Sequence, residues 1–109
     1  MVRLPDSQLY GLQAQFCQAL ANPARIHIVA ILADGPKTPS DLATELETGE
    51  PNVSRHLRVL HESGLVISAR EGPHVLYALA DKRIVKVLDL MREMLHDQLG
   101  RRTKLAGEM

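Results

Sequence analysis

The chain has little cysteine, few aromatic residues and no excess charge of either sign. Its 109 residues include one cysteine and no tryptophan, and aromatic residues make up 3%. One cysteine cannot form an internal disulfide, so a reducing compartment, the cytoplasm, is expected. Thirteen Lys and Arg residues balance thirteen Asp and Glu residues. A nonspecific nucleic-acid binder is normally basic overall, so any affinity for DNA must come from local placement of charge.

Membrane segments are also missing. No apolar run approaches the roughly 20 residues of a membrane span, and the amino terminus, M-V-R-L-P-D-S, lacks the apolar core of a signal peptide. No membrane partner is therefore expected. The composition, 45% hydrophobic and 24% charged, is typical of a globular domain. We predict a single domain over residues 1–109, with flexible tails at 1–6 and 100–109.

Apolar periodicity predicts two helices in the first third of the chain. The first spans residues 7–20, with Ser7 or Asp6 as its N-cap, and places leucines on one face. The second begins at Pro23 after an Asn22 cap and ends at an Asp-Gly-Pro stop. Isoleucine, valine and leucine surround nearly all of its circumference. This second helix is therefore expected to be central in the fold.

Two further helices follow, with a tight turn between them. Thr38 is predicted to cap a helix over 39–46, and Asp41 completes an approximate capping box. After a glycine-containing turn, the next helix runs from Glu50 to Ser63. Two short helices joined in this way form the helix-turn-helix pattern, whose second helix enters the major groove of DNA.

The apolar period changes from helical to alternating after Gly64, the expected left-handed helix cap. Residues 65–70 and 75–79 are predicted as strands, joined by the turn Glu71-Gly72-Pro73-His74. The helix over 50–63 thus leads directly into a β-hairpin. The predicted fold class is mostly α with a small β-hairpin wing (α+β), in the order of four helices, two strands and a last helix.

One face of the 50–63 helix carries residues suited to DNA. At about 100° per residue, Val53, Leu57 and Leu60 form a buried stripe and leave the opposite face free. Arginine can fork onto guanine, and asparagine onto adenine. The candidate DNA contacts are Asn52, Ser54, Arg55, His56 and Arg58 on this helix, Thr38 and Ser40 on the preceding helix, and Arg70 and His74 at the hairpin.

Alternatives remain at several of these positions. A solvated helix face is the other interpretation of the arginines, but the hairpin directly after the helix favours DNA contact. His56 lies nearer the buried edge, so it either orients the helix or touches DNA. Glu50 either accepts a hydrogen bond from cytosine or stabilises the start of the helix, and the second role is preferred.

Three segments together carry a family resemblance. They are A-L-A-N-P-A-R-I-H-I-V-A-I-L, P-N-V-S-R-H-L-R-V-L-H-E-S-G-L-V and R-E-G-P-H-V-L-Y-A-L, which cover residues from about 19 to 80. In order and spacing this region resembles the ArsR/SmtB-like family of bacterial winged helix-turn-helix regulators. The resemblance implies that the 50–63 helix reads DNA and that the hairpin is the wing. Gly49 and Glu50 depart from the serine and glutamine common in the family.

A long last helix is predicted from an Asp81 cap to about Leu99. Its apolar residues form a stripe that is widened by Val85, Leu90 and Met94. One small domain does not offer enough surface to bury such a helix. A second copy of the chain is the expected cover, which predicts a homodimer through the first and last helices.

The family often senses metals, and the resemblance implies two places to look. A thiolate site on the third helix would need cysteines where this chain has Pro39, Ser40 and Asp41. A last-helix site would keep Asp81 and Asp97, but its imidazole positions are occupied by Arg83 and Met94. Neither site is intact.

A shifted set, Asp89, Glu93 and His96, has helical spacing for metal coordination. Acids and histidines on an exposed helix face are usually just solvated, so this set is the minor alternative and no metal or other cofactor is predicted. Cys17 lies on an apolar helix and is expected to be a small packed residue rather than a redox switch.

These observations predict a sequence-specific regulator that binds double-stranded DNA as a dimer, as a repressor on an inverted-repeat operator. The alternative is a winged-helix module for protein association that binds no DNA, which the neutral charge keeps open. An enzyme is not expected, because the sequence shows no nucleophile–base–acid set, phosphate loop or intact metal site.

Overall fold

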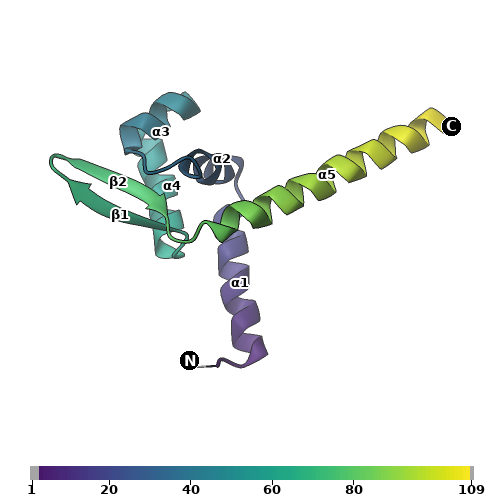
Figure 1. Cartoon of the computed structure of the whole chain (residues 1–109), viewed down its shortest axis with the longest axis horizontal. Coiled ribbons are helices and arrows are strands. Elements are labelled where there is room, and N and C mark those ends of the chain that lie inside the picture. Colours follow the sequence, from purple (N-terminus) through teal and green to yellow (C-terminus); the bar gives the residue numbers. More distant parts are fainter. Residues whose placement is uncertain (1–2, 109) are drawn as a thin grey trace.

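A computed structural model describes residues 3–108 of the chain, with side chains described for residues 3–101. Five helices and a two-stranded antiparallel hairpin follow one another in the predicted order (Figure 1). The elements are α1 (Asp6–Leu20), α2 (Pro23–Leu32), α3 (Pro39–Leu46), α4 (Glu50–Glu62), β1 (Val66–Glu71), β2 (His74–Leu79) and α5 (Arg83–Glu108). The predicted winged helix-turn-helix fold is confirmed.

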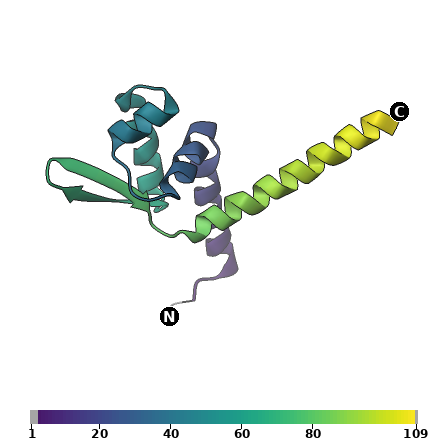
Figure 2. The ribbon, with the colours of Figure 1, turned by 45° about the horizontal axis from the view of Figure 1, so that its top comes forward.

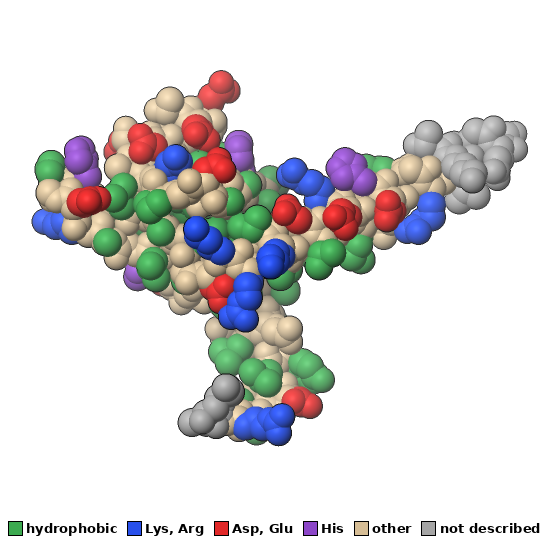
Figure 3. Space-filling view, viewed as in Figure 1, with side chains coloured by type: hydrophobic (Ala, Val, Ile, Leu, Met, Phe, Trp, Pro, Cys, Tyr) green, Lys and Arg blue, Asp and Glu red, His purple; other side chains and the backbone are tan. Residues whose placement is uncertain are grey.

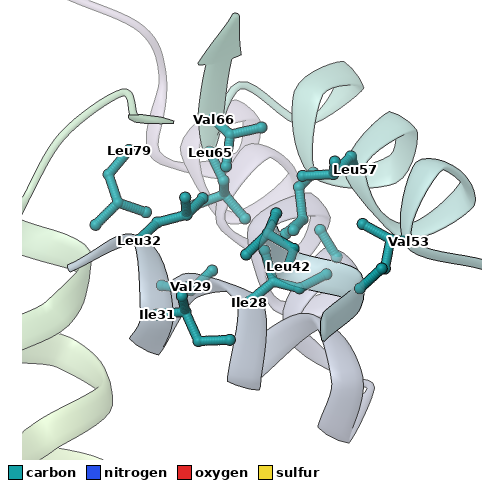
Figure 4. Close-up of a cluster of buried hydrophobic side chains, with 13 residues drawn as sticks. Ile28, Val29, Ile31, Leu32, Leu42, Val53, Leu57, Leu65, Val66 and Leu79 are labelled. Carbon is teal, nitrogen blue, oxygen red and sulfur yellow. The ribbon is translucent and has the colours of Figure 1, made fainter. Parts of the chain in front are cut away.

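The core lies between α2, α3, α4 and the base of the hairpin. Side chains from these elements point toward one another around Ile28 and Leu42, both with no exposed surface (Figure 4). The α2 helix supplies four buried residues to this cluster, which confirms its predicted central place. It starts at the predicted cap, where the Asn22 Oδ1 accepts hydrogen bonds from the backbone N–H groups of Ala24 and Arg25 at 2.9 and 3.3 Å.

The helix-turn-helix consists of α3 and α4. The predicted capping box at the start of α3 is present: Asp41 N–H donates to the Thr38 hydroxyl at 3.1 Å, and Thr38 N–H donates to the Asp41 carboxylate at 3.2 Å. In the turn between the helices, Glu47 takes the left-handed conformation with φ 53°. A residue with a Cβ is strained there, so this turn is held at a local cost.

The wing is a hairpin with a two-residue turn, Gly72-Pro73, between the paired residues Glu71 and His74. Gly72 has φ 62°, which suits the first turn position of a tight hairpin. The wing is also tied to the loop before α3. Backbone hydrogen bonds of 3.0 and 2.8 Å join Lys37 and Tyr77 in both directions, so the loop adds a third, one-residue strand position that the sequence did not reveal.

Two helices project from this body like arms (Figures 1 and 2). The α1 helix buries only Ala19 in the chain itself, and α5 packs on the core only near its start, through half-buried Ile84, Val85 and Leu88. Large apolar side chains on both arms stay exposed: Leu9, Leu12, Phe16, Val87, Leu90, Met91, Met94, Leu95 and Leu99. Within residues 3–108, no helix is long and apolar enough to cross a membrane.

Some local predictions are corrected. Pro5 is the N-cap of α1, and neither Asp6 nor Ser7 caps it; Asp6 lies inside the first turn, where its charge suits the helix dipole. Cys17 is exposed and not packed, because α1 leaves the body instead of lying on it. Val59 of α4, outside the predicted buried stripe, is half-buried against the core.

The last helix is longer than predicted. It continues to Glu108 instead of ending near Leu99. Gly100 weakens a helix but does not stop one, and the residues after it are mostly good helix formers without proline. The helix therefore runs through most of the stretch that was expected to be a tail.

Candidate nucleic-acid interface

The α4 helix presents its polar face because its apolar stripe is fully used by the core. Val53, Leu57 and Leu60 are 0, 1 and 0% exposed, as predicted. Asn52, Ser54, Arg55 and Arg58 are consequently exposed. Asn52 and the two arginines share the side of the helix opposite the stripe, whereas Ser54 lies at its flank. Packing of the stripe in the core thus fixes the side of α4 from which the two arginines project.

Asn52 is held at the start of α4. Its amide Nδ2 donates to the Thr48 hydroxyl at 3.2 Å, and this bond is exposed. The amide is therefore oriented from the turn but can exchange the hydroxyl for a base edge, because an exposed bond of this kind contributes little net stability. Glu50 is exposed in the first turn of the same helix, where an acid favours the helix dipole.

His56 is half-buried and lies against α2. Its Nδ1 is 3.5 Å from a terminal guanidinium nitrogen of Arg25. Burial lowers the pKa of His56 below 6.5, and the charges of Arg25 and Arg55 lower it further. The lowered pKa favours the neutral ring at pH 7. This position fits the alternative in which His56 orients the helix.

The wing places its two candidate residues on opposite faces. Arg70 pairs with Val75, and His74 pairs with Glu71. Cross-strand partners share a face and neighbours along a strand alternate, so Arg70 and His74 point to different sides of the hairpin. The structure therefore does not bring these two side chains together.

His74 instead lines the same hollow as the candidate residues at the start of α3. A hollow of about 500 Å³ between the start of α3 and the wing tip is lined by Thr38, Ser40 and His74, with Asp41 and Glu50 on its walls. Figure 3 shows acidic side chains over α3, and both acidic and basic side chains along α5. The two acids in the hollow make it a poor place for a phosphate. DNA contact is better served by the exposed arginines of α4.

Comparison with known proteins identifies the chain. Residues 22–68 match the family described as "Bacterial regulatory protein, arsR family". The HTH-type transcriptional regulator NmtR of Mycobacterium tuberculosis is 38% identical over 105 residues, which cover 94% of this chain and 88% of that protein. The chain belongs to the ArsR family. This is a family of transcriptional regulators and not of enzymes.

Solved structures agree with this assignment. The crystal structure of M. tuberculosis Rv0081 superposes with a TM-score of 0.78 at 32% identity, over 87% of this chain and 96% of that one. The solution structure of a homodimeric winged helix-turn-helix DNA-binding domain from Mycobacterium bovis, Mb0332, gives a TM-score of 0.77 at 28% identity, over 91% and 94%. Both similarities extend beyond the helix-turn-helix and wing, because they cover most of both chains.

At the position of the last-helix metal site that the family resemblance implied, Asp81 is paired with Arg83. At the start of α5, Asp81 accepts from Arg83: the carboxylate Oδ2 is 2.6 Å from the guanidinium, and Oδ1 accepts from the Arg83 backbone N–H at 2.9 Å. The hydrogen bonds from Arg83 lower the pKa of Asp81 to about 2. Among the side chains described, no group of three or more His, Cys, Asp or Glu could hold a metal ion. The Asp89, Glu93 and His96 set lies exposed on α5.

Two residues that matter for the arrangement of the site were not among the sequence candidates. Lys37 ties the loop before α3 to the wing through backbone bonds, which no side-chain pattern signals. Arg25 bridges three helices. Its place in the Asn-Pro-x-Arg motif was visible, but its partners were not, because His56 is 31 residues away in the chain.

Proposed function

We propose that this ArsR-family regulator is a cytoplasmic homodimer that represses transcription by binding an inverted-repeat operator. The observation that carries this proposal is the exposure of Arg55, Arg58 and Asn52 on α4, beside the wing. Each protomer would insert α4 into the major groove, with the wing on the flanking backbone.

The individual residues have different roles in this proposal. Arg55 and Asn52 would meet base edges, since forked donors on an exposed helix face suit guanine and adenine. Arg58 and the Ser54 hydroxyl would meet phosphates. Arg70 and His74 lie on opposite faces of the wing. Only one of these two side chains would therefore contact the DNA.

The dimer is supported by the exposed apolar surface of the arms. Leu95 is 53% exposed, Met94 63% and Leu12 48%, and isolated helices with such surfaces favour association. The similar M. bovis domain is homodimeric. A twofold dimer reads two half-sites, so the operator should be an inverted repeat.

Selection from a library of random DNA duplexes tests this function. The purified chain should enrich a sequence with two inverted half-sites about one helical turn apart, or a multiple of that spacing. Sedimentation of the chain alone should give about twice 12.1 kDa. A chain that sediments as a dimer but enriches no sequence even at low salt would instead be a protein-association module, which is the rival function.

A further inference from the structure

Arg25 joins three helices through one guanidinium group. It lies in the first turn of α2, where its Nε donates to the carbonyl oxygen of Ala19 at 2.6 Å. A terminal nitrogen donates to the Gln18 carbonyl at 3.4 Å. The other terminal nitrogen faces Nδ1 of His56 on α4 at 3.5 Å. One side chain of α2 thus contacts both the end of α1 and the DNA-reading helix.

The contact with α1 uses two carbonyl groups at the end of that helix. The Gln18 carbonyl also accepts from the Ala21 backbone N–H at 3.2 Å, and the Ala19 carbonyl accepts from Arg25. The last carbonyls of a helix lack partners within the helix and carry its negative dipole end. The Arg25 guanidinium supplies both hydrogen bonds and a positive charge at this end. It therefore fixes the end of α1 relative to α2, although α1 buries only Ala19 against the body.

The contact with α4 requires a neutral histidine. Arginine has no acceptor, so the His56 Nδ1 must accept and the proton of the neutral ring must be on Nε2. A protonated ring would point an N–H and a positive charge at the guanidinium. Among the described residues, the charges that act on the ring are Arg25 from α2 and Arg55 from α4 itself, and both are cations.

We propose that Arg25, acting through His56, is a positioning residue that sets the direction of α1 relative to the recognition helix α4. The inference rests on the proposed function, because α1 would form part of the dimer interface. The angle between α1 and α4 then decides how far apart the two recognition helices lie in the dimer. Arg25 therefore sets the half-site spacing that the dimer accepts.

A test without DNA uses the nitrogen chemical shifts of His56 in the full chain. The wild type should show the tautomer with Nε2 protonated at neutral pH. In R25Q the pKa of His56 should rise toward its ordinary value, and in R25K it should stay lowered because the charge is kept. A wild-type ring protonated on Nδ1, or a pKa identical in wild type and R25Q, would overturn the contact.

A test with DNA uses an operator selected with the wild-type chain, and the same duplex with one base pair inserted between its half-sites. Wild type should bind the duplex with the original spacing more tightly than the duplex with the insertion. In R25Q and R25K the ratio of these two affinities should fall about five- to tenfold. Lysine keeps the charge but cannot reach both carbonyls and the ring. Equal weakening on both duplexes would mean that Arg25 only supports folding, and would refute the positioning role.

His56→Asn supplies the matched variant, because its Oδ1 can accept near the Nδ1 position without titrating. Acidification from about pH 7.5 to about pH 5.5 should lower the affinity of the wild type for the operator relative to H56N. A histidine that simply met phosphate would show the opposite sign, since protonation would then strengthen binding. If the wild type selects no operator, the proposed function fails, whereas the nitrogen shifts still decide on the contact.

Discussion

The substitution Leu95→Ala on α5 tests the proposed dimer interface. Leu95 lies on the apolar side of the arm and is 53% exposed in the single chain. Burying a whole leucine side chain is worth about 1.5–3 kcal/mol. About half of that, or roughly 0.8–1.5 kcal/mol, is therefore available when a partner covers the residue.

Twofold symmetry doubles this contribution, because each dimer contains two copies of Leu95. The expected loss is about 1.5–3 kcal/mol per dimer, which corresponds to a dimer dissociation constant raised roughly 10- to 150-fold. Folding of the single chain should change less than association does, since half of the side chain is in solvent before the partner arrives.

Sedimentation equilibrium over a range of concentrations measures the dissociation constant directly. The control is Glu93→Ala, which lies on the opposite side of the same helix and is exposed. It should leave the dissociation constant within about threefold of the wild type. An unchanged dimer for Leu95→Ala, or equal weakening by both variants, would refute an interface on the apolar side of α5.

Three further predictions concern other parts of the chain. Glu47→Gly should raise the free energy of unfolding by about 0.5–1 kcal/mol in urea denaturation, because glycine takes the left-handed conformation without strain; a loss of stability would contradict the strain. Arg83→Gln should return the pKa of Asp81 from about 2 toward 3.8 in a carbon-detected titration. Any stabilisation of the fold by the Asp81–Arg83 pair is complete above pH 3.8 and is lost as the pH falls through about 2. A pKa of Asp81 that stays low in the variant would exclude Arg83 as the cause. Micromolar zinc, nickel or cobalt should leave operator affinity nearly unchanged; an about tenfold loss that His96→Ala abolishes would show a metal sensor.

Much of the fold could be predicted because its signals are local. The Asn22 cap and the Thr38 capping box each lie within three residues of the groups they satisfy. The buried stripe of α4 follows from one helical period. The wing turn follows from a Gly-Pro pair between two alternating segments. For these elements, sequence and structure depend on the same short-range chemistry.

The position of the two arms, α1 and α5, could not be predicted from local sequence patterns. Periodicity indicates that α1 has an apolar face, but it does not say whether the domain or a partner covers that face. The packed position predicted for Cys17 was wrong for this reason. The Arg25–His56 contact joins residues far apart in the sequence, and only the packing of α2 against α4 brings them together.

The central claim is that α4 reads bases, and one comparison of affinities tests it most directly. Binding of wild type and Arg55→Ala should be measured on the selected operator and on a scrambled duplex at the same salt concentration. Arg101→Ala, in the outer half of α5, removes the same charge away from α4 and serves as the control. Arg55→Ala should lose about 1–3 kcal/mol on the operator and little on the scrambled duplex. Equal losses on both duplexes, or no loss on the operator, would contradict base reading by α4.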